Sequence, residues 1–164
     1  MFVIKEYKPD FKKKSNINAR YFHILTKNND KFYINIENVH TIFGIEKEYQ
    51  NTIIKWCIND SEKDFFFNVD NIILETIKNY DKEGFKSITS NKKNIIIKKG
   101  FPNMVSSMFR DSPQDVIKHE KGSLPTFDSI VKKKKYSVSL CLNSLFVNLD
   151  KNELSFHYII KKII

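Results

Sequence analysis

The chain has 164 residues, a formal net charge of +9 and a pI near 9.4, and 41% of its residues are hydrophobic. This length and apolar content predict a single folded domain over residues 1–164 and exclude a disordered tail. The charge favours an anionic partner such as nucleic acid. Lys, Asn and Ile dominate, so the codon bias of an AT-rich genome is an alternative source of part of the charge.

Residue patterns in the first 36 positions predict β-strands. Residues 1–20 are a basic N-terminal segment whose opening FVIKEY is typical of a strand. Apolar residues alternate in 21–25 and again in 31–36, around the turn-forming residues 27–30. This pattern predicts a β-hairpin.

The middle of the chain predicts short helices with short strands between them. Asn38 can cap a helix that ends at Gly44, and a second helix is expected over 47–58, where Tyr49, Ile53 and Trp56 fall on one face. Residues 64–67 suggest a short strand. A clear helical stripe then covers 69–80 and ends by Gly84, 95–97 reads as a buried strand, and Pro102 suits the start of another helix.

The last third returns to strands. Residues 111–135 form a basic loop, and alternation in 136–142 and in two later runs up to 164 predicts a C-terminal β-hairpin or meander. The fold class expected is therefore α+β: a hairpin, central short helices with short strands, and C-terminal strands.

No catalytic signature is present. The sequence has no nucleophile elbow, phosphate-binding loop or dinucleotide motif. Cys57 and Cys141 are the only cysteines, and they form no ligand cluster with the four dispersed histidines. We therefore expect no enzyme activity, metal or cofactor. No segment is apolar enough for a signal peptide or membrane span, which predicts an intracellular protein.

Nucleic-acid binding has more support from the residues. In the helix expected over 47–58, the free face carries Lys47, Gln50, Asn51 and Lys55, in which amides can read base edges and lysines can contact phosphates. Further candidates bracket the strand at 95–97 or lie in the basic loop: Lys92, Lys93, Lys98, Lys99, Lys132, Lys133, Lys134 and Lys135. The alternatives are an ordinary polar helix face and solvated charge, and for the loop also a nuclear import signal.

Two stretches resemble the Bro N-terminal domain of baculoviruses and other large insect DNA viruses. That family has a strand entering a helix that ends in Leu-Gly-Tyr, then a helix with Lys-Ala-Ile, and later a strand that steps into another helix. In this chain the first strand and helix correspond to residues 34–39, and the Leu-Gly-Tyr step corresponds to 43–45. Residues 51–53 correspond to Lys-Ala-Ile, and residues 95–101 correspond to the later step from strand to helix. The Bro-N-like region would cover 21–110, and the strands after 136 have no place in it.

The resemblance implies DNA binding and a role in viral gene regulation or replication, in the cytoplasm or nucleus of a host cell. The DNA could be single- or double-stranded. The alternative is a viral interaction protein that binds a host protein through its sheet or hairpins, with incidental basic charge.

Overall fold

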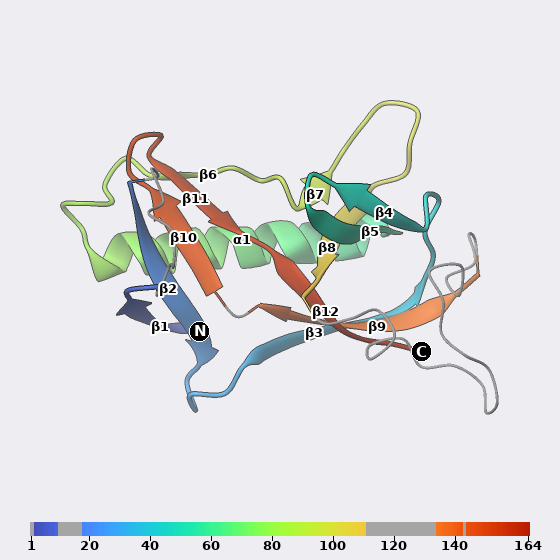
Figure 1. Ribbon diagram of the computed structural model, residues 1–164, viewed down its shortest axis with the longest axis horizontal. Helices are drawn as coiled ribbons and strands as arrows, with labels where there is room; N and C mark the ends of the chain where they lie inside the picture. Colours follow the sequence, from blue (N-terminus) through green and yellow to red (C-terminus); the bar gives the residue numbers. More distant parts are fainter. Residues whose placement is uncertain (1, 10–17, 111–133, 143) are drawn as a thin grey trace.

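The computed structural model describes residues 2–9, 18–110, 134–142 and 144–164. Within them, twelve strands and one long helix form an α+β fold that is rich in strands (Figure 1). In chain order the elements are β1 (Phe2–Tyr7), β2 (Ala19–Thr26), β3 (Phe32–Val39), β4 (Ile45–Glu48), β5 (Asn51–Cys57), α1 (Asp60–Tyr80), β6 (Thr89–Ser90), β7 (Ile95–Ile96), β8 (Met104–Phe109), β9 (Tyr136–Leu142), β10 (Ser144–Asn148), β11 (Glu153–Phe156) and β12 (Tyr158–Ile163).

The strands make two sheets. One has the order β1-β2-β10-β11-β6, and the other has the order β3-β9-β12-β8-β5-β4, with β7 also paired to β8. Most pairs are antiparallel, whereas β12 with β8 and β11 with β6 are parallel. No helix in these described ranges is both long and apolar enough to cross a membrane.

A long C-terminal hairpin connects the two sheets. Its arms are β9 followed by β10 and, after a turn, β11 followed by β12, and only His157 separates the last two strands. The arms pair as β10 with β11 in the first sheet and as β9 with β12 in the second. The hairpin therefore passes through both sheets and bends where one sheet gives way to the other, as the orange and red strands of Figure 1 show.

Helix α1 covers the inner face of both sheets (Figure 1). Phe66, near its start, packs edge-on against Tyr158 of β12 with ring centroids 5.2 Å apart, and Tyr80 at its end meets Phe22 of β2 at the same separation. Its buried Val69, Ile73 and Ile77 join the same hydrophobic core. Burying each such side chain contributes about 1.5–3 kcal/mol, so the helix holds the bent sheets together.

The stripe predicted over 69–80 is confirmed as part of α1, but the strand predicted over 64–67 is wrong. The helix begins earlier because Asn59 and Glu62 form a capping box. The Asn59 side chain accepts a hydrogen bond from Glu62 N at 2.7 Å, and Glu62 Oε1 accepts one from Asn59 N at 2.9 Å. The helix ends at Tyr80, four residues before the Gly84 expected to end it.

The three other predicted helices are also wrong. The segment 38–44 is the end of β3 and a bend, 47–58 is the hairpin of β4 and β5, and the segment after Pro102 is β8. In β5, Ile54 and Trp56 face the core and Thr52 lies on the same face of the strand, and this period of two overlaps the helical spacing that we read. Branched Thr and Ile side chains favour the strand.

The strands predicted at 21–25, 31–36, 95–97 and 136–142 are confirmed, and so is the C-terminal hairpin. The pairing predicted for the first two is wrong, because β2 joins β10 and β3 joins β9. The turn between them does form, with Asn29 N donating to Thr26 O at 3.0 Å. The two strands diverge because each follows a different half of the bent C-terminal hairpin.

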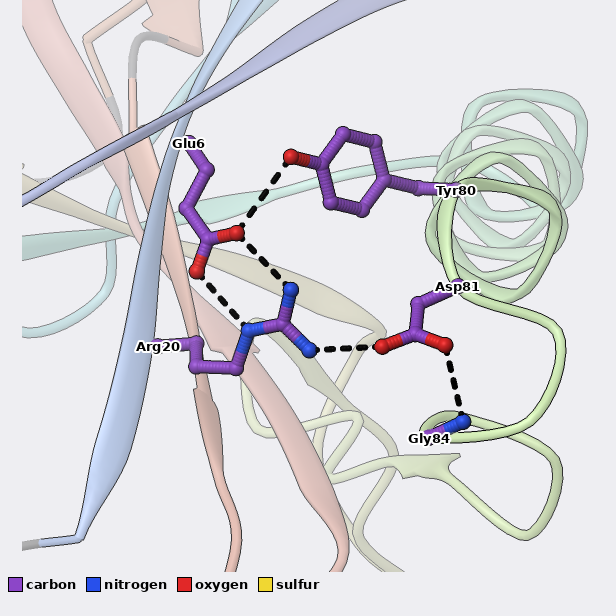
Figure 2. Close-up of polar contacts among 5 residues, drawn as sticks. All are labelled: Glu6, Arg20, Tyr80, Asp81 and Gly84. Atoms are coloured by element: carbon purple, nitrogen blue, oxygen red, sulfur yellow. Dashed lines mark hydrogen bonds and ion pairs between the residues drawn. The ribbon is translucent and has the colours of Figure 1, made fainter.

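An arginine cluster ties β1, β2 and the end of α1 together (Figure 2). Arg20 makes a bidentate contact to Glu6, at 2.8 and 2.7 Å, and a third hydrogen bond to Asp81 at 2.8 Å. Its guanidinium lies 4.5 Å from the centre of the Phe85 ring. These hydrogen bonds from Arg20 lower the pKa of both carboxyl groups. Arg20 is thus a structural residue whose charge is already balanced.

Gly84 completes this cluster. Its backbone N donates to Asp81 Oδ1 at 2.9 Å, and a Cβ at this position would lie 2.5 Å from the other oxygen of the same carboxylate. A side chain here would therefore displace Asp81 from Arg20.

Asp70 is the one carboxyl group of α1 that faces the core. It is 2% exposed, and neither its carboxylate oxygens nor the nearby Tyr158 hydroxyl has a hydrogen-bond partner among the described residues. Burial raises the pKa of Asp70 to about 6, although Lys92 opposes the shift. The folded protein consequently favours the neutral acid, and stability falls as pH rises from about 4 through 6, where Asp70 ionises first in the unfolded chain.

We expect Asp70→Asn to stabilise the protein only at pH values at which Asp70 is charged in the unfolded chain. A pKa raised by about two units corresponds to about 3 kcal/mol. The gain in free energy of unfolding should grow as pH rises from 4 through 6 and stay constant above that. Urea unfolding of both proteins at several pH values measures it. The exposed Asp64→Asn on the same helix is the control, and a gain for Asp70→Asn that does not change with pH would contradict the assignment.

Candidate nucleic-acid interface

An aromatic row lies on the outer face of the first sheet. Tyr7 of β1, Tyr21 of β2 and Phe146 of β10 are register partners on three neighbouring strands. Their ring centroids are 6.1 Å apart between the tyrosines and 6.0 Å apart between Tyr21 and Phe146. The alternate residues Phe22 and Leu145 point to the core, so the strand period of two places the row on the opposite face.

The aromatic row borders a cavity at the bend between the sheets. This cavity of about 270 Å³ is also lined by Arg110, which follows β8, and by His157 at the β11–β12 junction. A second cavity, of about 420 Å³, shares His157 and Met108 with the first. We call the two adjoining cavities the bend groove. Its second half is lined by Glu48, Tyr49, Asn51, Ile53, Lys93, Asn94, Ser106, Ser107 and Tyr158.

The bend groove carries more positive than negative charge. Partial burial lowers the pKa of His157, and the nearby Arg110 and Lys93 lower it further, while Glu48 acts in the opposite direction. His157 is therefore neutral at pH 7, and the charge of the groove comes from Arg110 and Lys93, partly offset by Glu48. Two cations beside neutral aromatic rings can bind a phosphate near a flat apolar group.

Tyr49 lines the second half of the bend groove. It occupies the two-residue turn between Glu48 and Asn51 with φ of 57°, and its side chain is 96% exposed. Such a turn favours Gly or Asn, because a positive φ strains other residues by roughly 1–3 kcal/mol. Because the ring is almost fully exposed, it buries almost no surface in the fold, and its position indicates contact with another molecule. The prediction that Tyr49 is a core residue is wrong, whereas Ile53 and Trp56 are buried as expected.

A second aromatic and basic cluster continues from the groove along the same face. Lys55 follows the groove residue Ile53 by two positions on β5 and pairs with the groove residue Ser106. Its Nζ lies 5.7 Å from the Phe43 ring centre, and Phe43 lies 6.0 Å from Phe101. Lys98 then lies 5.4 Å from the Phe101 ring centre. We call these four residues, Phe43, Lys55, Lys98 and Phe101, the Phe43 cluster.

The structure thus divides the predicted binding residues. Asn51 and Lys93 line the bend groove, and Lys55 and Lys98 belong to the Phe43 cluster. Lys47 pairs with Thr52, so it points to the opposite face of the sheet, and Gln50 is exposed in the turn. The single helix face expected to carry Lys47, Gln50, Asn51 and Lys55 does not exist, because this segment is a β-hairpin.

The other predicted lysines are peripheral. Lys92 and Lys99 are exposed in turns beside β7, outside the cavities described. Lys134 and Lys135 are exposed just before β9, and Lys135 Nζ lies 3.4 Å from His40 Nδ1. Lys132 and Lys133 lie outside the described residues, as does most of the basic loop.

Sequence reasoning missed Arg110, His157 and Phe146. Arg110 follows a segment that we read as helix, so its place at the end of a strand beside β12 was not expected. Phe146 does carry a signal: it alternates with Leu145 and Val147 and therefore had to face outward if those residues were core. His157 has no local signal, because it acquires its neighbours only through the bend.

No family model matches the chain, and no characterised protein or solved structure is significantly similar to it. The strand-to-helix units on which the Bro-N resemblance rests are strands joined by turns in this structure. Cys57 and Cys141 are free and buried. Within the described residues, no group of three or more His, Cys, Asp or Glu side chains could hold a metal ion.

We expect Tyr49→Asn to stabilise the fold. Asn tolerates a positive φ, so the change should relieve strain and raise the free energy of unfolding by about 0.5–1 kcal/mol. Denaturant unfolding measures this. Tyr33→Asn is the control, since Tyr33 is an exposed tyrosine of β3 that is absent from the positive-φ residues. A loss of stability in Tyr49→Asn equal to that of the control would show that the turn is not strained.

Proposed function

We propose that the protein binds DNA along the bend groove, as a small basic binding protein without catalytic activity or cofactor. One observation carries the proposal: Arg110 and Lys93 each line one of the two adjoining cavities of a groove that three neighbouring aromatic rings border. A phosphate contact needs a cation, and Arg110 can contact phosphate oxygens through two N–H groups at once. The Phe43 cluster adds the cation Lys98 along the same face, while its Lys55 is paired with Glu46 at 3.7 Å.

The role in viral gene regulation or replication, which the Bro-N resemblance implies, is the biological setting that we propose. An intracellular site of action, in the cytoplasm or nucleus of a host cell, belongs to the same proposal. Both depend on DNA binding, which is the step that can be measured directly.

A second candidate function is binding of a host protein. The specific observation is a cavity of about 620 Å³ between β3 and the start of α1, lined in part by Tyr33, Phe65 and Phe66. β3 is an edge strand, so its free side could pair with an added strand. This site lies on other elements than the bend groove, and the two functions can therefore be tested separately.

Removal of the groove cations should weaken DNA binding and its salt dependence together. In the double variant Arg110→Gln, Lys93→Gln, the slope of log K against log salt should become shallower by about 1.4–1.8 units, because each of the two phosphate contacts contributes about 0.7–0.9. Fluorescence anisotropy with labelled DNA from 50 to 200 mM salt measures the slope.

Two matched variants make this test specific. Lys82→Gln, Lys86→Gln removes the same charge at exposed positions after α1 and should leave the slope almost unchanged. Glu48→Gln removes the opposing charge in the groove and should tighten binding several-fold. Equal effects of the two double variants would mean that net charge, and not the groove, holds the DNA.

A further inference from the structure

We propose that the nucleic acid bound in the groove is single-stranded, with unpaired bases stacked on Phe146 of the aromatic row and on Tyr49. This inference rests on the proposed function and names the chemistry that the same site recognises. Unpaired bases are common to single-stranded DNA and RNA.

The placement of the rings is the first argument. A base inside a duplex exposes only its edges, whereas an unpaired base exposes a flat face that stacks on aromatic side chains. The rings of Tyr7, Tyr21 and Phe146 lie side by side across three strands and border the cavity that contains Arg110. One face of Tyr7 is already stacked on His23 at 3.9 Å, and we assign the stacking of a base to Phe146, which lines the cavity.

The second argument is that cations lie among these rings. Arg110 lines the cavity that the aromatic row borders, and the Tyr49 turn lies near Arg110, because Asn51 and Arg110 directly adjoin the paired residues Thr52 and Phe109 in the chain. Lys93 lines the same cavity as Tyr49. A single strand presents bases and phosphates in alternation, and a groove that contacts both needs rings and cations side by side. In a duplex the faces of the bases are stacked on one another and cannot contact these rings, so a duplex would contact only the cations.

The third argument is Tyr49 itself. An almost fully exposed tyrosine in a backbone conformation that disfavours it contributes no packing to the fold. Strain of this kind persists at ligand sites, where contact with the ligand compensates for the lost stability. A base stacked on Tyr49 would provide this contact.

The test compares four probes of about 12 nucleotides at one low salt concentration: a mixed-sequence DNA strand, the same sequence as RNA, the DNA duplex, and a DNA strand whose bases are replaced by abasic sites. The inference predicts that the base-containing strands bind at least about ten-fold more tightly than the duplex or the abasic strand. Equal binding of the DNA and RNA strands would assign recognition to bases and phosphates, and a preference for one would name the sugar recognised.

Ring variants locate the stacking. Phe146→Leu and Tyr49→Asn should each weaken binding of the single strand by about five-fold or more and leave binding of the abasic strand unchanged. Tyr33→Leu, an exposed aromatic outside the groove, is the control, and the unfolding midpoint of each variant verifies that it is folded. An abasic strand that binds as tightly as the normal strand, or a duplex that binds more tightly, would overturn the inference and leave DNA binding intact. Absence of binding to all four probes at low salt would instead overturn the proposed function.

Discussion

The hydrogen bonding of the C-terminal hairpin constrains the whole molecule. Its two arms stay paired from Ile163 and Val138 at one end to Glu153 and Asn148 at the other, although they belong to different sheets at the two ends. Every other strand pairs, directly or through neighbouring strands, with one of these arms. A bent two-stranded core therefore determines where β2, β3 and β8 lie, and these strands in turn position the aromatic row and Arg110.

The bend also explains why the two faces of the sheets differ so much. The inner face wraps around α1 and buries the large residues Phe22, Phe66 and Tyr158. Because the inner face forms the hydrophobic core, the outer face at the bend can hold rings and cations that contribute little to folding. Arg20 illustrates the contrast, because its charge is fully used by Glu6 and Asp81, whereas Arg110 lines a cavity.

The sequence predicted the two ends of the chain better than its middle. The C-terminal hairpin was visible because its alternation is regular and its turn is rich in Asp and Asn. The hairpin of β4 and β5 was read as helix, since Tyr49, Ile53 and Trp56 fit a helical spacing while Thr52, Ile54 and Trp56 fit a strand. The capping box of Asn59 and Glu62 was a readable signal for the start of α1.

The candidate site was predictable only in part. Asn51, Lys55, Lys93 and Lys98 were recognised as polar or basic candidates, but their grouping on one outer face depends on the register of β5 with β8. A local sequence pattern cannot predict this register, because the two paired strands are about fifty residues apart in the chain. Arg110 and His157 meet for the same reason, through the parallel pairing of β8 with β12.

Mapping the contact surface by NMR tests the central claim most directly. A ¹⁵N-labelled protein titrated with a single DNA strand of about 12 nucleotides reports the amides that a ligand touches. The account predicts the largest shifts in β1, β2 and β10 around the aromatic row and at Lys93, Arg110, His157 and Tyr49, with little change along the exposed side of α1. Shifts confined to Lys134, Lys135 and their neighbours, with none at the bend groove, would contradict it.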